Sequence, residues 1–402
     1  MFEHLHLLNE DTILGLMAQY RADPAARKVD LGVGVFRDLS GNTPILDCVR
    51  EAERMVLAEQ TTKSYVAAAG RAEFNEAAVD LVLGSARSAI GPARLRVVQA
   101  PGGCGALRVG AELLRAASST TRVLVSDPTW GNHLPLLGGA GLRLETYPYY
   151  DVAAHRLRFA AMLERLDLAA PGDVVLLHAC CHNPTGADLA PAEWRELTEV
   201  LVRRRLLPFV DLAYQGFGDG LDADAFGLRH VAAAVPELLI AVSFSKNLGI
   251  YRERLGALIL LAESGAAATA AHSHVLQIAR GIYSMPPDHG AAIAARIFAD
   301  ARLQNQWHAE LTVMRERLHA MRKLLSEALR RATGTREFDF LVDQRGMFSQ
   351  LGCSKAAVAR LREEHHIYML SNSRMNLAGL MPADAGFVAG SIAAVLGAER
   401  AA

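Results

Sequence analysis

One lysine of this 402-residue sequence has a position suited to chemistry. Only five of its 42 lysines and arginines are lysines, and Lys246 lies in SFSKNLG, where the apolar run LLIAVSF ends. At the end of a buried strand an amine loses water, which lowers its pKa and frees its lone pair for attack on a carbonyl. Lys246 is therefore a candidate Schiff-base lysine, although a surface lysine beyond a strand end fits the same pattern.

Asp211 ends a second apolar run, in LLPFVDLAY. A carboxylate is costly to bury there without a partner, so it either caps the next segment or pairs with a cation. A pyridinium nitrogen is one such cation, and the pairing keeps the ring protonated and able to accept electrons. Tyr214, in the same run, and Asn183, in HACCHNPTG, could both hydrogen-bond the phenolic oxygen of that ring.

A glycine-rich segment, PGGCGA at residues 101–106, precedes the helical-looking run Leu107–Leu114. Glycines before a helix let backbone N–H groups approach a phosphate. The segment does not match the GxGxxG pattern of dinucleotide sites. Ser243, Ser245 and Arg254, which flank the lysine, would complete a site for a single phosphate, and this favours pyridoxal phosphate over NAD.

These polar residues follow short apolar runs that alternate with helical segments. Pro191–Arg205, for example, has apolar residues at helical spacing and a proline suited to a first helical turn. The alternation predicts an α/β domain with a mostly parallel sheet, in which ligands bind beyond the carboxyl ends of the strands. The predicted strands are Leu95–Gln99, Val123–Ser126, Val174–His178, Leu207–Asp211, Leu239–Phe244 and Ala257–Leu261.

The sequence pattern changes in the C-terminal part. An apolar stripe from Leu311 to Leu325 indicates one long helix, which we expect to end near Gly334. Short β-like pieces and two further helices follow it. The expected divisions are an N-terminal arm that joins the small domain (1–44), a large cofactor-binding domain (45–290), and a hinge helix with a small domain (291–402).

The overall composition excludes several classes of partner. Acidic and basic residues nearly cancel, 43 against 42, which gives no reason to expect nucleic acid or an acidic membrane. No apolar run reaches the ~18 residues of a membrane helix, and MFEHLHLLNEDT at the N-terminus lacks a secretory pattern. Five cysteines in a long chain indicate a reducing compartment, so we expect the cytoplasm. The adjacent Cys180, Cys181 and His182 lack the spacing of a zinc site, and no metal is expected.

In their order and spacing these motifs resemble those of class I (fold-type I) aminotransferases of the aspartate and aromatic amino acid aminotransferase family. The resemblance runs nearly end to end, and SFSKN with FVDLAYQGFGDGL is its most specific part. It implies an α/β fold whose large domain holds a mostly parallel sheet between helices, with a smaller α+β domain. The other matching stretches are VDLGVGVFRD, TKSYVAAAGRAEFN, PGGCGALRVGAELL, SDPTWGNH, CCHNPTGADL, SFSKNLGIYRERLGAL, YSMPPDHGA, RGMFS and SRMNLAGL.

The resemblance implies a pyridoxal 5'-phosphate bound to Lys246 through a Schiff base, with the same amine moving a proton during catalysis. Asp211 would pair with the ring nitrogen. Asn183 and Tyr214 would bond the phenolic oxygen, and Trp130 would stack on the ring. The residues implied at the phosphate are Gly103, Cys104, Ser243, Ser245, Arg254 and, from a neighbouring subunit, Tyr65.

The resemblance further implies a homodimer with shared active sites that binds small amino acids and 2-oxo acids. Arg374 would bind the substrate α-carboxylate with help from the backbone of Gly34. Arg280 of the neighbour would meet a side-chain carboxylate, because guanidinium binds carboxylates in a bidentate geometry. Trp130 and Asn183 would also contact the substrate.

Three positions depart from the family pattern. Cys104 stands where Thr or Ser is usual, Met285 where a small polar residue is usual, and Leu248 where Phe is usual. The first two leave the catalytic residues intact but leave the fine substrate preference open. The flexible thioether of Met285 could adapt to differently shaped partners, or both residues could merely repack the pocket. We expect amino transfer from aspartate, phenylalanine or tyrosine to 2-oxoglutarate in a ping-pong mechanism.

Two other functions use the same motifs. A pyridoxal-phosphate-dependent β-lyase or decarboxylase keeps the cofactor, and a binding or regulatory protein keeps only the fold. The presence of both Arg374 and Arg280 favours transamination of dicarboxylates. The complete set of Lys246, Asp211 and Tyr214 argues against a protein without activity.

Overall fold

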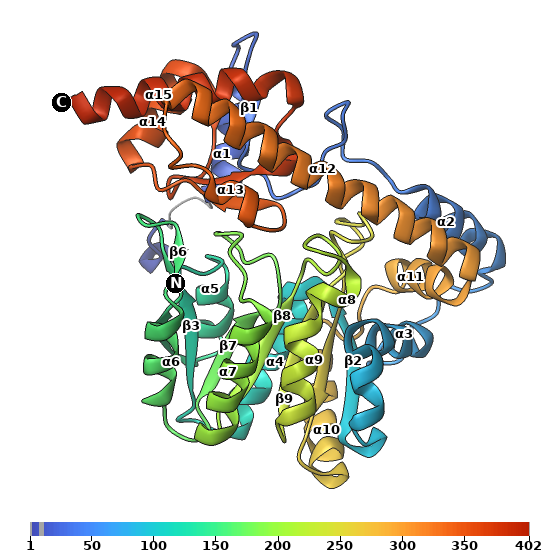
Figure 1. Ribbon diagram of the computed structural model, residues 1–402. Coiled ribbons are helices and arrows are strands. Elements are labelled where there is room, and N and C mark those ends of the chain that lie inside the picture. The colour runs from blue at the N-terminus through green and yellow to red at the C-terminus, as the bar shows by residue number, and fades with distance from the viewer. Residues whose placement is uncertain (1, 8–11, 402) are drawn as a thin grey trace.

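A seven-stranded sheet forms the centre of the computed structural model, which describes residues 2–7 and 12–401 (Figure 1). Strand β10 runs antiparallel to both of its neighbours, and the other neighbouring strands pair in parallel. In spatial order the strands are β2 (Leu95–Pro101), β10 (Leu255–Leu261), β9 (Leu238–Ser243), β8 (Leu207–Leu212), β7 (Val174–His178), β3 (Arg122–Asp127) and β4 (Arg143–Pro148).

Apolar side chains cover both faces of this sheet. Along β7, Val174 and Leu176 belong to one buried cluster, whereas Val175 and Leu177 belong to another. Successive side chains of a strand point to opposite faces, so an uninterrupted apolar run produces two apolar surfaces. Each surface needs its own layer of helices to exclude water.

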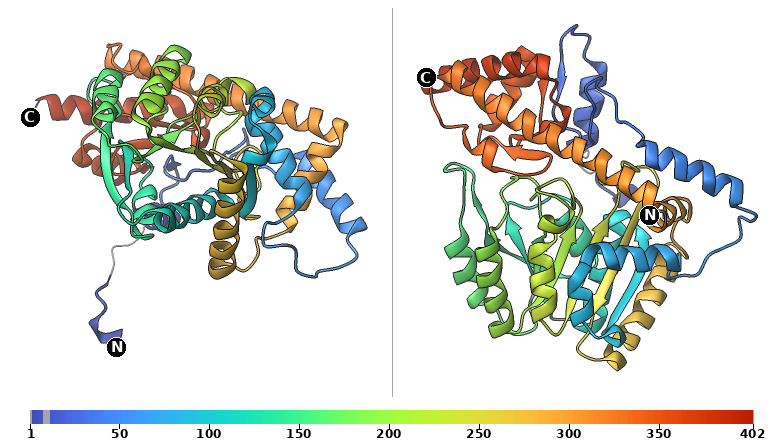
Figure 2. Two further views of the ribbon diagram at one scale, coloured as in Figure 1. Left: turned by 90° about the horizontal axis from the view of Figure 1, so that it is seen from below. Right: turned by 45° about the vertical axis from the view of Figure 1, so that its right-hand side comes forward.

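The helices supply these two layers (Figure 2). Helices α4, α5 and α10 pack on one face, and α3, α6, α7, α9 and α11 pack on the other. The helix bounds up to α11 are α1 (Thr12–Ala22), α2 (Asp47–Glu59), α3 (Ala72–Leu83), α4 (Gly102–Ala117), α5 (His133–Gly138), α6 (Phe159–Asp167), α7 (Pro191–Arg204), α8 (Leu221–Asp224), α9 (Phe226–Ala234), α10 (Gly265–Ile282) and α11 (His289–Ala299).

Helix α12 (Ala301–Thr333) connects the sheet to a second, smaller body (Figure 1). Its Leu311 and Leu318 pack in the core of the sheet, whereas Leu325 and Leu329 pack in a separate core. The helix ends at Gly334, which has the left-handed φ of +70° that glycine adopts without strain. One rigid helix therefore spans both bodies.

The smaller body combines segments from both ends of the chain. Strand β1 (Val29–Asp30) pairs with β12 (Ile367–Tyr368), and β11 (Phe348–Gln350) pairs with β13 (Arg374–Asn376). The N-terminal arm, which follows α1, therefore joins the C-terminal elements through the pairing of β1 with β12. The smaller body also contains α13 (Phe340–Asp343), α14 (Lys355–His365) and α15 (Ala385–Ala401). The hairpin of β5 (Tyr150–Asp151) and β6 (Arg156–Leu157) belongs to the larger body.

All six predicted strands are present, with ends that differ by at most two residues, and the helix predicted from Pro191 ends at Arg204. Two features differ from the sequence interpretation. Strand β4 was not predicted, because it lies at the edge of the sheet and only Tyr147 of its residues is buried. Helix α4 begins at Gly102 rather than at Leu107, so the glycine-rich segment forms its first turn. No described helix combines the length and apolar character needed to cross a membrane.

Candidate active site

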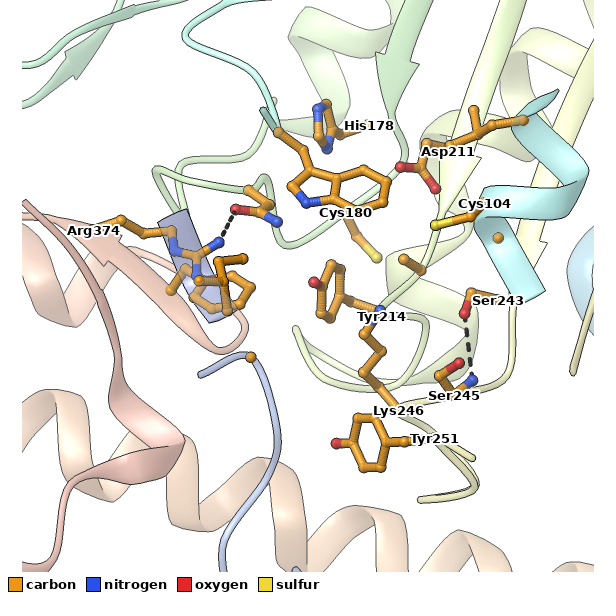
Figure 3. Close-up of a pocket in the computed structure, with 18 of the residues that line it drawn as sticks. Cys104, His178, Cys180, Asp211, Tyr214, Ser243, Ser245, Lys246, Tyr251 and Arg374 are labelled. Carbon is orange, nitrogen blue, oxygen red and sulfur yellow. Dashed lines mark hydrogen bonds between the residues drawn. The ribbon is translucent and has the colours of Figure 1, made fainter. Parts of the chain in front are cut away.

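The carboxyl ends of the central strands surround a cavity of about 280 Å³ (Figure 3). Lys246 follows β9, Asp211 lies in β8 and Asn183 follows β7. Twelve of the fourteen residues proposed from the sequence line this one cavity. They are Gly34, Gly103, Cys104, Trp130, Asn183, Asp211, Tyr214, Ser243, Ser245, Lys246, Arg254 and Arg374.

Lys246 points into the cavity, where its amine lies 4.9 Å from the centre of the Tyr214 ring (Figure 3). Burial lowers the pKa of this amine, while the negative charge of Asp211 opposes that shift. A lowered pKa increases the fraction of neutral amine at physiological pH, which is the form that acts as a nucleophile or a base. The structure thus gives Lys246 the environment that the sequence predicted.

Asp211 is held as a carboxylate beneath the cavity floor. Burial by itself raises its pKa, but the hydrogen bond from His133 and the electrostatic interaction with the same ring outweigh that effect and lower it. His133 Nε2 lies 3.1 Å from Asp211 Oδ2, and Thr129 Oγ1 lies 2.8 Å from His133 Nδ1. His178, which lines the cavity, stays neutral because burial lowers its pKa to about 3. Asp211 therefore offers a negative charge to any cation that enters.

The first turn of α4 and the segment after β9 form an anion cradle. The first backbone N–H groups of a helix have no partners within the helix, and they attract anions. A Cβ at Gly103 would come within 3.1 Å of Ser243 Cβ, so any larger residue there would crowd Ser243. Arg254 adds a positive charge and donates to the hydroxyl of Ser245 at 3.3 Å. These donors fit a phosphate group.

Cys104 changes the chemistry of this cradle. Its thiol accepts a weak hydrogen bond from Asn132 at 3.7 Å, and burial raises its pKa. The neutral thiol is a poorer donor than a hydroxyl, so the cradle relies more on backbone N–H groups and on Arg254.

Arg374, on the opposite side of the cavity, is 3% exposed (Figure 3). Its Nη1 donates to Asn183 Oδ1 at 3.2 Å and its Nη2 donates to the carbonyl of Gly32 at 2.9 Å. Its Nε has no hydrogen-bond partner among the described residues, and burial lowers its pKa to about 10. A buried guanidinium bonded only to neutral groups is suited to an incoming carboxylate.

Tyr65 and Arg280 lie elsewhere on the chain. Tyr65 is 91% exposed and, with Met285, lines a separate cavity of about 720 Å³. Arg280 projects from the end of α10 and contacts only the hydroxyl of Ser284 through its side-chain hydrogen bond. Within one chain these two residues are therefore not part of the first cavity, and their roles stay predictions.

His133, Phe348 and Tyr251 are among the residues of the site that had no role assigned from the sequence. His133 and Phe348 lie within the stretches SDPTWGNH and RGMFS, but neither pattern indicated contacts with Asp211 or Arg374. Tyr251 lines the cavity and its hydroxyl accepts a hydrogen bond from the Phe36 backbone at 3.0 Å. All three contacts join residues distant in sequence, so local pattern gave no signal for them.

Known proteins are similar to this chain over nearly its whole length. Aspartate aminotransferase of Escherichia coli strain K12 is 43% identical over 396 residues, covering 98% of this chain and 100% of that protein. The aromatic-amino-acid aminotransferase of Pseudomonas aeruginosa is 46% identical over 370 residues, covering 92% of each.

A solved structure is similar to this chain in both sequence and fold. The crystal structure of an aromatic-amino-acid aminotransferase from Burkholderia pseudomallei, described as covalently bound to pyridoxal phosphate, superposes with a TM-score of 0.94 at 42% identity. The match covers 98% of this chain and 99% of that chain. Residues 26–392 match the family described as aminotransferase class I and II. The chain therefore belongs to the class I and II aminotransferases.

Proposed function

We propose that this chain transfers the amino group of an L-amino acid to 2-oxoglutarate, using pyridoxal 5'-phosphate attached to Lys246. The observation that carries the proposal is the convergence of Lys246, Asp211 and Arg374 on one cavity. These residues offer a nucleophilic amine, a fixed negative charge and a carboxylate receptor, which together suit a cofactor and an amino acid.

The residues present fit the cofactor. The anion cradle of Gly103, Ser243, Ser245 and Arg254 would hold its phosphate, and Asp211 would hold its ring nitrogen. When bound, the cofactor supplies an electron sink for the bonds of the amino acid α-carbon. Trp130 would cover one face of the ring, and Asn183 and Tyr214 would bond its phenolic oxygen.

Three side chains would bind the substrate, move the proton and donate a hydrogen bond. Arg374 binds the substrate α-carboxylate, and its rigid contacts with Asn183 and Gly32 fix the direction from which the substrate enters. The Lys246 Nζ, once free, accepts a proton from the α-carbon and returns it, and its lowered pKa increases the fraction of the neutral amine that can do so. Burial raises the pKa of Tyr214, so its hydroxyl stays protonated and serves as a donor.

We infer aspartate and aromatic amino acids as donors. Relatives with nearly full-length matches are named aspartate aminotransferase and aromatic-amino-acid aminotransferase, and the chain has arginines suited to both carboxylates of a dicarboxylic substrate. An aromatic side chain would instead displace Arg280 towards water and pack against apolar groups near Met285.

We further propose that the active unit is a homodimer in the cytoplasm, with each site completed by its neighbour. Tyr65 and Arg280 lie outside the cavity of their own chain, as expected for residues that serve the other site. A two-fold interface would create two equal composite sites.

The test is a panel of amino donors with 2-oxoglutarate, followed by detection of glutamate. Glutamate formed from aspartate and from phenylalanine or tyrosine supports the proposal. Release of ammonia with pyruvate, or of carbon dioxide, without glutamate would identify a lyase or decarboxylase instead. Turnover of aspartate alone would restrict the enzyme to dicarboxylates.

A further inference from the structure

Helix α12 buries an arginine, Arg322, that is 1% exposed. Its guanidinium donates five hydrogen bonds, all to neutral oxygens. Nη1 donates to the Leu341 carbonyl at 3.2 Å and to Ser349 Oγ at 2.7 Å. Nη2 donates to the carbonyls of Arg345, Gly346 and Phe348 at 3.0, 2.8 and 2.7 Å.

A buried charge that is bonded only to neutral groups is costly, and burial lowers the pKa of Arg322 to about 10. An apolar side chain would fill the same space at lower cost, as replacement of buried charges shows in other proteins. The benefit of this arginine therefore lies in the geometry that its five bonds impose. All five acceptors belong to residues 341–349, which lead into β11.

The same segment also contacts the turn that carries Asn183. The backbone N–H of Arg345 donates to the carbonyl of Gly186 at 2.7 Å. A Cβ at Gly346 would lie 2.4 Å from Cys181 Cβ, so the two backbones are in close contact. Arg322 and this turn therefore hold the same segment, next to the wall of the cavity that Asn183 lines.

The segment ends at Phe348, whose ring supports Arg374. Phe348 pairs with Asn376 across the β11–β13 ladder, which makes it a diagonal neighbour of Arg374 on the same face. The Arg374 guanidinium lies 4.3 Å from the centre of the Phe348 ring, within the range of a cation–π contact. The edge of Tyr214 meets the same ring at 6.0 Å between centroids.

We propose that Arg322 is a positioning residue for the carboxylate site: by fixing the Phe348 backbone it fixes the ring on which Arg374 rests. The proposal depends on the proposed function only in that Arg374 receives the substrate carboxylate. Arg322 itself does not line the cavity, so it acts through the residues that it holds, and of these Phe348 lines the cavity.

The decisive variant is Arg322→Lys, studied as the cofactor-loaded enzyme. Lysine keeps the charge but donates from a single nitrogen, so it cannot bond both the acceptors of Nη1 and the acceptors of Nη2. The readout is binding of 3-phenylpropionate, measured by calorimetry, because this ligand has one carboxylate and no amino group to react. We expect the Kd to rise about tenfold, which corresponds to ~1.4 kcal/mol. KM for amino donors should rise in parallel, and kcat should change by less than about twofold.

Arg317→Lys is the matched control. Arg317 lies on the same helix and also donates to backbone carbonyls, those of Ala378, Leu380 and Asp38, but it has no bond to residues 341–349. Its replacement should lower the melting temperature and leave the Kd for 3-phenylpropionate unchanged. If both variants weaken the ligand equally, a general loosening of α12 explains the result and the proposal is wrong.

A double-mutant cycle tests the route through the ring. In a Phe348→Leu background the ring is already absent, so Arg322→Lys should weaken the ligand by less than about twofold. Full additivity of the two changes would overturn the proposal. If Arg322→Lys does not fold, Ser349→Ala replaces it in the same cycle, because it removes one acceptor of the guanidinium; we then expect about a threefold rise in Kd, and no rise would overturn the proposal.

The outcome is separable from the proposed function. If the unaltered enzyme fails to form glutamate from any donor, the proposed function fails. If it forms glutamate and binds 3-phenylpropionate, but Arg322→Lys binds that ligand equally well, only the role of Arg322 fails.

Discussion

Around Lys246 the polar side chains converge on one cavity, whereas Tyr65 and Arg280 lie outside it. The cavity is built by the ends of central strands, and its charged groups have defined partners in the same chain. The segment that carries Tyr65, between α2 and α3, extends away from the larger body (Figure 2).

Several large apolar side chains are exposed outside the cavity. Leu57 and Ile282, near the ends of α2 and α10, are 75% and 50% exposed, and Phe2, Leu5 and Leu7 of the N-terminal segment are exposed as well. Such side chains mark a surface that another chain covers where they form one contiguous patch. One chain thus brings the residues proposed for the cofactor into one cavity, whereas Tyr65 and Arg280 lie outside it, where the proposed homodimer would place them at the neighbouring site.

Replacement of Lys246 should have the largest effect. Lys246→Ala removes both the attachment point and the proton carrier, so we expect no detectable turnover with any donor. Borohydride reduction of the native enzyme and peptide mapping should place the pyridoxyl group on Lys246. Lys323→Ala, at an exposed position of α12, is the matched control and should retain full activity. A label on Lys63 would refute the assignment.

Asp211→Ala should follow in size. The carboxylate is the negative charge nearest to the cofactor ring nitrogen in the proposed site, and loss of such a preorganised charge costs about 10²- to 10³-fold in rate. The anion cradle should still retain cofactor, which visible absorption can measure. Asp222→Ala removes a carboxylate that is 91% exposed and should leave the rate unchanged. Near-normal rates in Asp211→Ala would mean that the ring nitrogen has another partner.

The sequence was sufficient to locate this part of the site. Lys246 and Asp211 each follow an apolar run, and neighbouring parallel strands bring such positions to one edge of a sheet. The direction of β10 could not be predicted, because an apolar run has the same pattern in parallel and antiparallel strands. The start of α4 at Gly102 was missed because glycine is a poor helix former and local propensity favours a loop there.

Other contacts of the site could not be predicted, because no local sequence pattern encodes them. Arg374 meets Asn183 across 191 positions of sequence, and Phe348 meets Arg374 through strand pairing. His133 reaches Asp211 from a different strand end. The roles of Arg374, Tyr65 and Arg280 were therefore predicted only from family resemblance, and those of Tyr65 and Arg280 concern a second chain.

Hybrid dimers test the contrast directly. Lys246→Ala and Arg280→Ala chains are each expected to be poor with aspartate, since one lacks the reacting amine and the other the side-chain carboxylate receptor. In a heterodimer of the two, one site has both residues intact. Random exchange makes half of the dimers heterodimers, so aspartate activity should return to about a quarter of the native value. Heterodimers that stay inactive, or a fully active monomer in sedimentation, would reject the shared site.

A smaller effect concerns the pKa of Lys246 without cofactor. Burial lowers that pKa and Asp211 raises it, so Asp211→Asn should lower it further. The neutral amine is the reactive form, and its acylation rate should therefore reach half of its maximum at a lower pH in the variant. Mass spectrometry of Lys246 acylation against pH measures the shift, with Asp222→Asn as the control. A shift to higher pH would show that the two groups do not interact as the structure indicates.

The smallest effect should come from Met285, which lines the surface cavity beside Tyr65. Its thioether presents an apolar and flexible surface to a partner site, and we expect this to favour aromatic donors over aspartate. Met285→Asn should lower the ratio of kcat/KM for phenylalanine to that for aspartate by about three- to tenfold, the equivalent of one or two lost methylene contacts. Val313→Asn, at an exposed apolar position of α12, should leave the ratio unchanged. An unchanged ratio in Met285→Asn would mean that this residue only fills space, and that aromatic specificity is set within the enclosed cavity alone.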